Sequence, residues 1–252
     1  MHPILFSIGP VHAYGYGLMI GLGALIAILL SQWRANRRGL DGELVFNAAL
    51  IGLFAGLAGA KLTFIASNYK LLFTDPKYVL GTDGFTVYGG IVLGILAGAL
   101  VLRHSKVSIA EYLDLVIPQI ALAQGFGRIG CFLAGCCYGK ETDSALGVVF
   151  PPEAIAPSGV SLLPTQLFSA AGDFLIFLLL YFLVGKLKPL QVTGGYLCLY
   201  GIGRFAIEFL RDDPRRMLFG LTSNQYVSIL YLLIGLICIV SCIVRTKNEP
   251  QI

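Results

Sequence analysis

The sequence predicts an all-α protein that crosses a membrane several times. Of its 252 residues, 56% are hydrophobic and only 13% are charged, and the mean hydropathy is +0.79. These values lie far outside the balance of soluble globular domains. An apolar segment of about 20 residues spans the hydrocarbon layer as a helix. Seven such segments are expected, near residues 14–33, 43–66, 85–102, 110–134, 165–185, 193–211 and 225–244.

The individual spans differ in what they carry. The first has no Lys or Arg before Arg34, so it lacks the basic front end of a cleavable signal peptide and is expected to be retained. In the second and third spans, glycines recur at every fourth position: Gly52 and Gly56, then Gly90, Gly94 and Gly98. Small residues at this spacing let helix backbones approach closely, which predicts packing rather than a ligand site. The long connection 139–164 either carries function or is an inert covering.

The basic residues of the connections predict the orientation. One alternate set holds nine: Arg34, Arg37, Arg38, Arg103, Lys106, Lys186, Lys188, Arg245 and Lys247. The other holds six: Lys70, Lys77, Lys140, Arg211, Arg215 and Arg216. The positive-inside rule then places the N-terminus outside and the C-terminus in the cytoplasm. These basic residues also account for the net charge of +4 without a nucleic-acid partner. No long linker separates two folded units, so residues 1–252 are expected to form a single integral membrane domain.

Two arginines lie inside predicted spans. Arg128 stands in the run Gly-Phe-Gly-Arg-Ile-Gly, and Arg204 in Tyr-Gly-Ile-Gly-Arg-Phe-Ala-Ile-Glu. A cation at the centre of a bilayer costs about 2.5–3.5 kcal/mol, so each guanidinium is expected to have an anionic partner or ligand. At ~1.5 Å per residue, Arg128 lies about 27 Å from the cytoplasmic start of its span, where it could meet a lipid phosphate. The alternative is an arginine that snorkels from a helix end.

A polar stripe in the sixth span points to the same layer. Tyr200, Arg204 and Glu208 are four residues apart, so they share one helix face. The Arg–Glu pair is either a plain buried ion pair or part of a reaction site. Tyr16 and Tyr88, near the outer starts of the first and third spans, reach the same depth, although each could be an ordinary interfacial aromatic. The convergence of these groups predicts a polar site toward the outer leaflet.

The order of these motifs carries further information. Along the chain, the motifs are Tyr16-Gly17-Leu18-Met19, Gly89-Gly90, Gly127-Arg128-Ile129-Gly130 with Phe132 and Gly139, Pro164-Thr165-Gln166-Leu167, and Tyr200 through Arg204 to Glu208 and Phe209. The set resembles the bacterial phosphatidylglycerol:prolipoprotein diacylglyceryl transferases. The resemblance implies a seven-helix protein of the bacterial cytoplasmic (inner) membrane with its active site toward the outer leaflet. It also implies transfer of a diacylglyceryl group from phosphatidylglycerol to the lipobox cysteine of a preprolipoprotein, which forms a thioether and releases glycerol 1-phosphate.

The resemblance assigns roles to particular residues, without a metal or a diffusible cofactor. The substrate-binding residues would be Arg128, Tyr200, Gly127 and Gly139. The catalytic residues would be Arg204, Glu208, Tyr16 and Tyr88. A planar guanidinium suits bidentate contact with phosphate, which fits Arg128 to the headgroup and Arg204 to the departing phosphate. The acceptor thiol must lose its proton before it can attack, so a base is also required.

This chain departs from the family pattern inside the signature itself. Tyr88 stands where the family has a histidine that is often proposed as the base, and tyrosine is a poorer base at neutral pH. Cys131, Ala134 and Cys136 replace two asparagines and a glutamate, and Ser169 replaces a second glutamate, whereas Asp173 matches an acidic position. These changes mark either a variant branch that performs the same reaction or a paralogue that uses the pocket on a different acceptor. A non-catalytic lipid- or peptide-binding protein is the alternative from another class.

Half of the six cysteines fall in that signature, and their role is open. Cys131, Cys136 and Cys137 lack the C-x2-C pairs of common zinc sites, and metal binding, a disulfide and nucleophilic chemistry are all compatible with the spacing. The others lie in apolar spans, where cysteine behaves as a small hydrophobe: Cys198, Cys238 and Cys242.

Overall fold

The computed structural model describes residues 4–8, 11–81, 84–212 and 217–248. Its contacts divide the chain into two compact units, one formed by residues 28–112 and the other by residues 1–27 with 113–252. A single domain over residues 1–252 therefore stays a prediction. Arg215 and Arg216, which contributed to the predicted orientation, lie outside the described residues.

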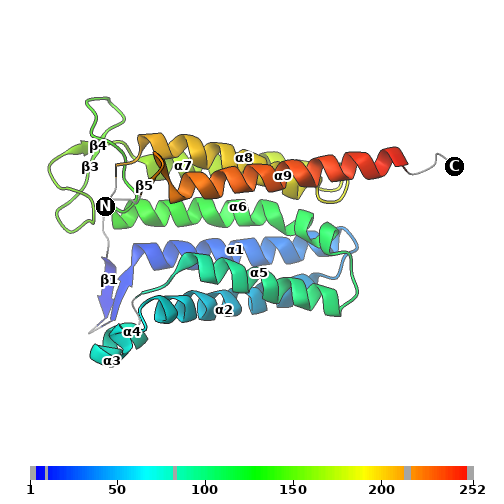
Figure 1. Ribbon diagram of the computed structural model, residues 1–252, viewed down its shortest axis with the longest axis horizontal. Coiled ribbons are helices and arrows are strands. Elements are labelled where there is room, and N and C mark those ends of the chain that lie inside the picture. Colours follow the sequence, from blue (N-terminus) through cyan, green and yellow to red (C-terminus); the bar gives the residue numbers. More distant parts are fainter. Residues whose placement is uncertain (1–3, 9–10, 82–83, 213–216, 249–252) are drawn as a thin grey trace. The chain divides into compact units, whose positions relative to one another are not determined.

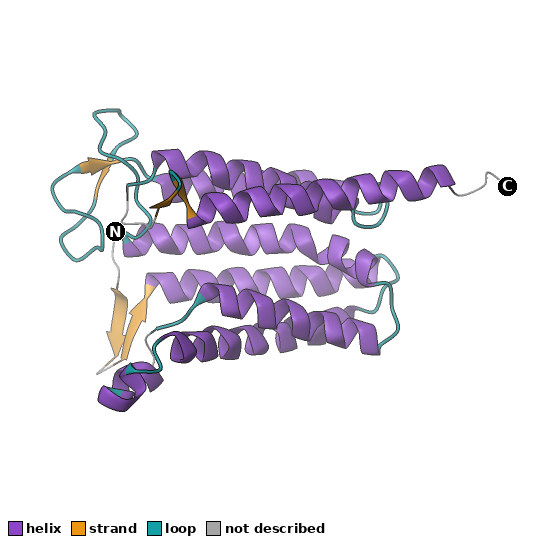
Figure 2. Cartoon of the chain, in the orientation of Figure 1, coloured by secondary structure: helices purple, strands orange, loops and turns teal. Residues whose placement is uncertain are grey.

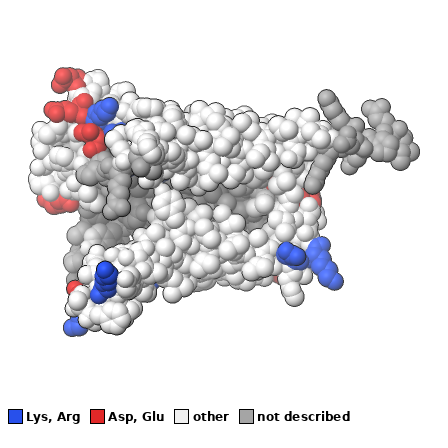
Figure 3. Space-filling view, viewed as in Figure 1, with Lys and Arg blue, Asp and Glu red and all other residues white. Residues whose placement is uncertain are grey.

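Long helices dominate the described residues (Figures 1 and 2). Each predicted span corresponds to one helix: α1 Gly15–Arg37, α2 Gly42–Ser67, α5 Val87–His104, α6 Ile109–Ala134, α7 Thr165–Leu183, α8 Gln191–Ile207 and α9 Ser223–Asn248. Six of these helices are long and apolar enough to cross a membrane, and α8, with 17 residues, is not among them. Charged side chains on the face drawn in Figure 3 gather at helix ends and in connections, so the middle parts of the helices show almost no charge on this face.

The unit of residues 28–112 is built on the pairing of α2 with α5. Asp41 starts α2 by accepting a 2.9 Å hydrogen bond from the Leu44 amide. A Cβ added at Gly90 would lie 2.9 Å from the Gly56 carbonyl oxygen, and one at Gly94 would lie 3.0 Å from that of Gly52. The predicted role of these glycines in close helix packing is therefore confirmed. Two short helices, α3 Leu71–Thr74 and α4 Pro76–Leu80, follow α2.

The larger unit packs α6, α7, α8 and α9 together, and these helices carry the candidate site. A core between α6, α7 and α8 is formed by Ile117, Ala121, Leu180, Val184, Val192 and Tyr196. The buried Asp114 carboxylate accepts hydrogen bonds from the Thr193 amide at 2.8 Å and from its hydroxyl at 2.5 Å, so α6 and α8 are also joined by polar contacts. Helices α8 and α9 approach closely at Gly201, which has no side chain in the way. A Cβ added there would lie only 2.8 Å from the Ser228 carbonyl oxygen.

Within the described ranges, three two-stranded antiparallel sheets accompany the helices. Their strands are β1 Ile4–Ile8 with β2 Val11–Tyr14, β3 Val148–Val149 with β4 Ser161–Leu162, and β5 Met217–Leu218 with β6 Leu221–Thr222. The all-α prediction missed them. Strands of two residues are too short to produce a recognisable alternation of apolar and polar residues, and the longer pair was hidden by its apolar surroundings.

The connection between α6 and α7 is an ordered part of the larger unit. Phe150, Ala156 and Leu162 form a small buried core within it. The Gly139 amide donates to the Leu163 carbonyl at 2.9 Å, and the Lys140 amide donates to the Leu210 carbonyl at 2.8 Å. The second contact ties this connection to the end of the 3-10 helix η1, Glu208–Leu210, which follows α8. The arginine-bearing ends of α6 and α8 are thus held by the same segment.

Candidate functional site

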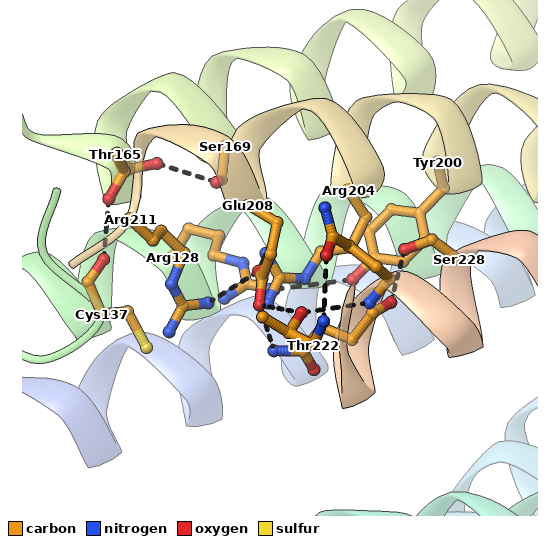
Figure 4. Close-up of polar contacts among 12 residues, drawn as sticks. Arg128, Cys137, Thr165, Ser169, Tyr200, Arg204, Glu208, Arg211, Thr222 and Ser228 are labelled. Carbon is orange, nitrogen blue, oxygen red and sulfur yellow. Dashed lines mark hydrogen bonds and ion pairs between the residues drawn. The ribbon is translucent and has the colours of Figure 1, made fainter. Parts of the chain in front are cut away.

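Glu208 is the centre of a buried charge network at the end of α8 (Figure 4). One turn before it, Arg204 places Nη1 2.8 Å from Glu208 Oε2, as the four-residue spacing predicted. Arg211 Nη1 lies 3.9 Å from the same oxygen. The other oxygen, Oε1, accepts hydrogen bonds from the Thr222 hydroxyl at 2.7 Å and from Asn224 Nδ2 at 3.1 Å. Since the Glu208 side chain is 0% exposed, these contacts fix its position and that of Arg204.

Arg128 stands in a different situation. Its guanidinium, on α6, donates a long 3.5 Å hydrogen bond from Nη2 to the Tyr200 hydroxyl on α8. It forms no ion pair with any residue that the structure describes. Asp173 acts on it electrostatically but forms no ion pair with it, so the Arg128 guanidinium can also bind an anion that comes from outside the chain. Arg128, Tyr200 and Arg204 line one cavity, so the two arginines meet in a common pocket as predicted.

That cavity, of about 80 Å³, lies among α6, α7 and α8. Its polar lining is Arg128, Ser169, Asp173, Tyr200 and Arg204. Asp173 is only 4% exposed, and its Oδ2 has no hydrogen-bond partner within the described structure. The cavity thus offers two guanidinium groups, a phenol and a carboxylate with one oxygen unengaged. With Arg211 and Glu208 included, three cations face two carboxylates, so the site is suited to one more negative charge.

The positions of the two predicted catalytic tyrosines, Tyr16 and Tyr88, do not establish a role in the site. Tyr16, the second residue of α1, packs its backbone against α6, since a Cβ at Gly130 would lie 3.1 Å from the Tyr16 carbonyl oxygen. This contact is two residues from Arg128, but a catalytic role for Tyr16 stays a prediction. Tyr88 is 53% exposed on α5 and belongs to the unit of residues 28–112. Its convergence with Arg128 also stays a prediction.

The two glycines assigned to substrate binding have different surroundings. A Cβ added at Gly127 would meet nothing within 4 Å, so open space adjoins this position. At Gly139 a Cβ would lie 2.7 Å from both the Leu163 carbonyl oxygen and the Thr165 Cγ2 atom. Close backbone packing therefore accounts for glycine at position 139. A contact of either glycine with substrate stays a prediction.

Three members of the charge network were not predicted from the sequence: Arg211, Thr222 and Asn224. Arg211 was counted among the exposed connection residues that set the orientation, whereas it is 8% exposed and faces Glu208. Its position three residues after Glu208 was the signal that could have revealed it. Thr222 and Asn224 lie 14 and 16 residues beyond Glu208, and no local pattern connects them to it.

Fold and site together define a multi-pass membrane protein whose helices enclose a cationic cavity. Residues 3–241 match the family described as prolipoprotein diacylglyceryl transferase, and the chain belongs to this family. The resemblance recognised from the ordered motifs is thereby confirmed.

Relatives of known name agree with this assignment over most of their length. The chain is 42% identical over 239 residues to the phosphatidylglycerol–prolipoprotein diacylglyceryl transferase of Clostridium tetani, which covers 94% of this chain and 96% of the relative. It is also 42% identical over 240 residues to the phosphatidylglycerol–prolipoprotein diacylglyceryl transferase 2 of Clostridium perfringens, with 94% of each chain covered. The corresponding enzyme of Dehalococcoides mccartyi strain 195 is 32% identical over 231 residues, or 90% of this chain and 88% of the relative.

Proposed function

We propose that this chain transfers the diacylglyceryl group of phosphatidylglycerol to the lipobox cysteine of preprolipoproteins. The acceptor sulfur forms a bond to the glycerol carbon of the lipid, and the bond between that carbon and the phosphate oxygen breaks. The electron pair of the broken bond leaves with glycerol 1-phosphate, and the thiol proton passes to a base. Family membership supports the reaction. The main structural support for the site is the cavity in which Arg128 and Arg204 lie with Asp173, whose Oδ2 has no hydrogen-bond partner in the described structure.

The two arginines have different tasks in this reaction. Arg128 forms no ion pair in the described structure, so its guanidinium is available to the phosphodiester of the bound lipid. Arg204 is held at 2.8 Å by Glu208, which is itself held by Thr222 and Asn224. A guanidinium fixed in this way can stabilise the charge that develops on the departing phosphate without first reorganising. Glu208 therefore acts by positioning Arg204. Tyr200 completes the polar wall through its contact with Arg128.

Two carboxylates are candidates for the base: Asp173 in the cavity and Glu208 in the charge network beside it. Both oxygens of Glu208 are engaged by cations or hydrogen-bond donors, which makes this carboxylate a poor proton acceptor. Asp173 lines the cavity with an oxygen that has no partner in the described structure, so it is the better candidate to receive the thiol proton. For Tyr88 and Tyr16, a direct part in catalysis rests on the family motifs.

The proposed membrane arrangement has seven crossings, with the N-terminus outside, the C-terminus in the cytoplasm and the cavity toward the outer leaflet of the bacterial inner membrane. Helix α8 supplies the remaining crossing together with η1. The segment Gln191–Leu210 would extend about 30 Å at ~1.5 Å per residue, which matches the hydrocarbon thickness. The excess of basic residues in the alternate connections supports this orientation.

A reconstituted assay tests the function. The purified chain is incubated with phosphatidylglycerol and a lipobox peptide, and the thioether product and glycerol 1-phosphate are measured by mass spectrometry. Both products are expected. Release of glycerol 1-phosphate with an unmodified peptide would indicate another acceptor, and neither product would indicate a binding protein. Arg128→Ala and Arg204→Ala are expected to abolish turnover, whereas Arg103→Ala, at the exposed end of α5, serves as the matched control.

A further inference from the structure

A cluster of thiols lies beside the cavity, where α6 ends. The Sγ atoms of Cys131, Cys136 and Cys137 all lie within 4.8 Å of one another, and the three residues are partly buried. Cys131 is in the last turn of α6, and the chain then reverses through Gly135 and Cys137, whose φ angles are 73° and 62°. A non-glycine residue in this left-handed region is unfavourable by about 1–2 kcal/mol, so the surrounding structure must maintain it.

Buried side chains from the start of α7 maintain this turn. Gln166 Nε2 donates to the Cys136 carbonyl at 2.7 Å, and the Thr165 hydroxyl donates to the Cys137 carbonyl at 2.7 Å. Both side chains belong to residues that are 1% exposed. The Cys136 amide also donates to the Cys131 carbonyl at 3.1 Å. The backbone that carries the three thiols is therefore fixed before any ligand arrives, and this preorganisation lowers the entropy lost on binding.

Two cations lie near this cluster. Arg211 and Arg128 are close enough to act electrostatically on the Cys137 sulfur. Positive charge nearby favours the thiolate, which is the form of cysteine that binds a metal ion.

We propose that Cys131, Cys136 and Cys137 form a binding site for a thiophilic metal ion of the Zn²⁺ or Cd²⁺ class. Three sulfurs that each lie about 2.3 Å from one ion are roughly 4 Å apart, which is compatible with the observed cluster. Thiolates select soft and borderline metals over Mg²⁺ or Ca²⁺. A divalent ion with three thiolates carries one net negative charge, and the positive charges of Arg211 and Arg128 act on the Cys137 sulfur.

A disulfide accounts for less of this arrangement. It would join two of the cysteines and leave the third thiol without a function, whereas all three sulfurs are mutually close. A metal ion uses all three and joins the end of α6 to the segment that leads to α7. The C-x4-C-C spacing alone does not predict the site. Cys136 and Cys137 come close to Cys131 only because the left-handed turn at Gly135 and Cys137 reverses the chain.

Cadmium provides a direct probe, because its bonds to thiolate absorb in the ultraviolet. The full chain, purified in detergent under a phosphine reductant, is titrated with Cd²⁺. We expect the charge-transfer band to saturate at one ion per chain, and an excess of Zn²⁺ to compete with Cd²⁺ and weaken the band. Cys131→Ser, Cys136→Ser and Cys137→Ser should each weaken the affinity at least tenfold, since even the loss of an outer-shell partner costs about 10–100-fold. Cys242→Ser, in α9, is the matched control and should bind as the unchanged chain does.

If a Cys→Ser variant fails to fold, a second measurement on the unaltered chain still tests the proposal. Bound Cd²⁺ should protect Cys131, Cys136 and Cys137 from alkylation together, as mapped by mass spectrometry. The proposal is overturned if the fully reduced chain shows no cadmium band, or if the band survives all three substitutions. It is equally overturned if alkylation of the three residues is independent of Cd²⁺. None of these readouts depends on transferase activity, so they separate the metal site from the proposed function.

Discussion

The substitution Glu208→Gln tests the idea that a buried carboxylate positions the catalytic arginine. The glutamine amide has nearly the shape of the carboxylate but offers only one acceptor oxygen. If that oxygen keeps its contacts with Thr222 and Asn224, the amide NH₂ group faces the Arg204 and Arg211 guanidinium groups, which are now 2.8 and 3.9 Å from the former Oε2 position. Donors then face donors. If the amide turns over, the Asn224 contact is lost instead.

The expected magnitude follows from the burial of this network. The Glu208 and Arg204 side chains are 0% and 12% exposed, so the substitution leaves two largely buried cations without their counter-ion. Breaking a buried pair in this way costs about 3–5 kcal/mol. For a chain of this size that corresponds to a Tm lower by roughly 6–20 °C. A misplaced Arg204 should reduce kcat/KM about 100-fold, because catalytic groups tolerate shifts of only about 1 Å.

Thermal unfolding in detergent and the reconstituted transfer assay measure the two effects on the same preparation. Thr222→Val is the matched control, because it leaves the charge of Glu208 in place and removes two contacts of the Thr222 hydroxyl, its hydrogen bond to Glu208 and the one that it accepts from the Gln225 amide. It should lower stability by about 2–4 kcal/mol and retain most of the activity, so kcat/KM separates the two variants. Unchanged Tm and kcat/KM in Glu208→Gln would refute the positioning role of the carboxylate.

The remaining predictions concern the base, the close packing at Gly139 and the family position of Tyr88. Asp173→Asn should lower kcat by about 10²–10⁴-fold with the fold retained, because a general base is lost. Ser169→Ala, in the same cavity, should have little effect, and a wild-type kcat in Asp173→Asn would exclude this base. Gly139→Ala should lower stability by about 1–3 kcal/mol in a denaturation assay, because its methyl group would meet the Leu163 carbonyl oxygen at 2.7 Å; an unchanged midpoint would contradict the packing argument. Tyr88→His should raise turnover and Tyr88→Phe should lower it if this residue takes part in proton transfer; equal rates for all three would remove it from the mechanism.

The membrane helices follow from local properties of the sequence. Apolar runs of the right length predicted every long helix in the described residues, because the bilayer fixes the length of a spanning helix. The glycine spacing predicted close helix packing, which the structure shows at Gly56 and Gly90, and the four-residue spacing predicted the pairing of Arg204 with Glu208. Each of these features repeats with the period of a single helix. The ordered motifs also determined the family.

Only the tertiary structure decided which distant groups meet. The sequence could not indicate that Thr222 and Asn224 engage Glu208, or that Asp173 on α7 shares a cavity with Arg128 on α6, since helix packing sets these contacts. The three thiols converge because a left-handed turn, held by Thr165 and Gln166, folds Cys136 and Cys137 back toward Cys131. Helical period fixes contacts within a turn or two, whereas contacts across loops depend on backbone angles and packing that spacing alone does not encode.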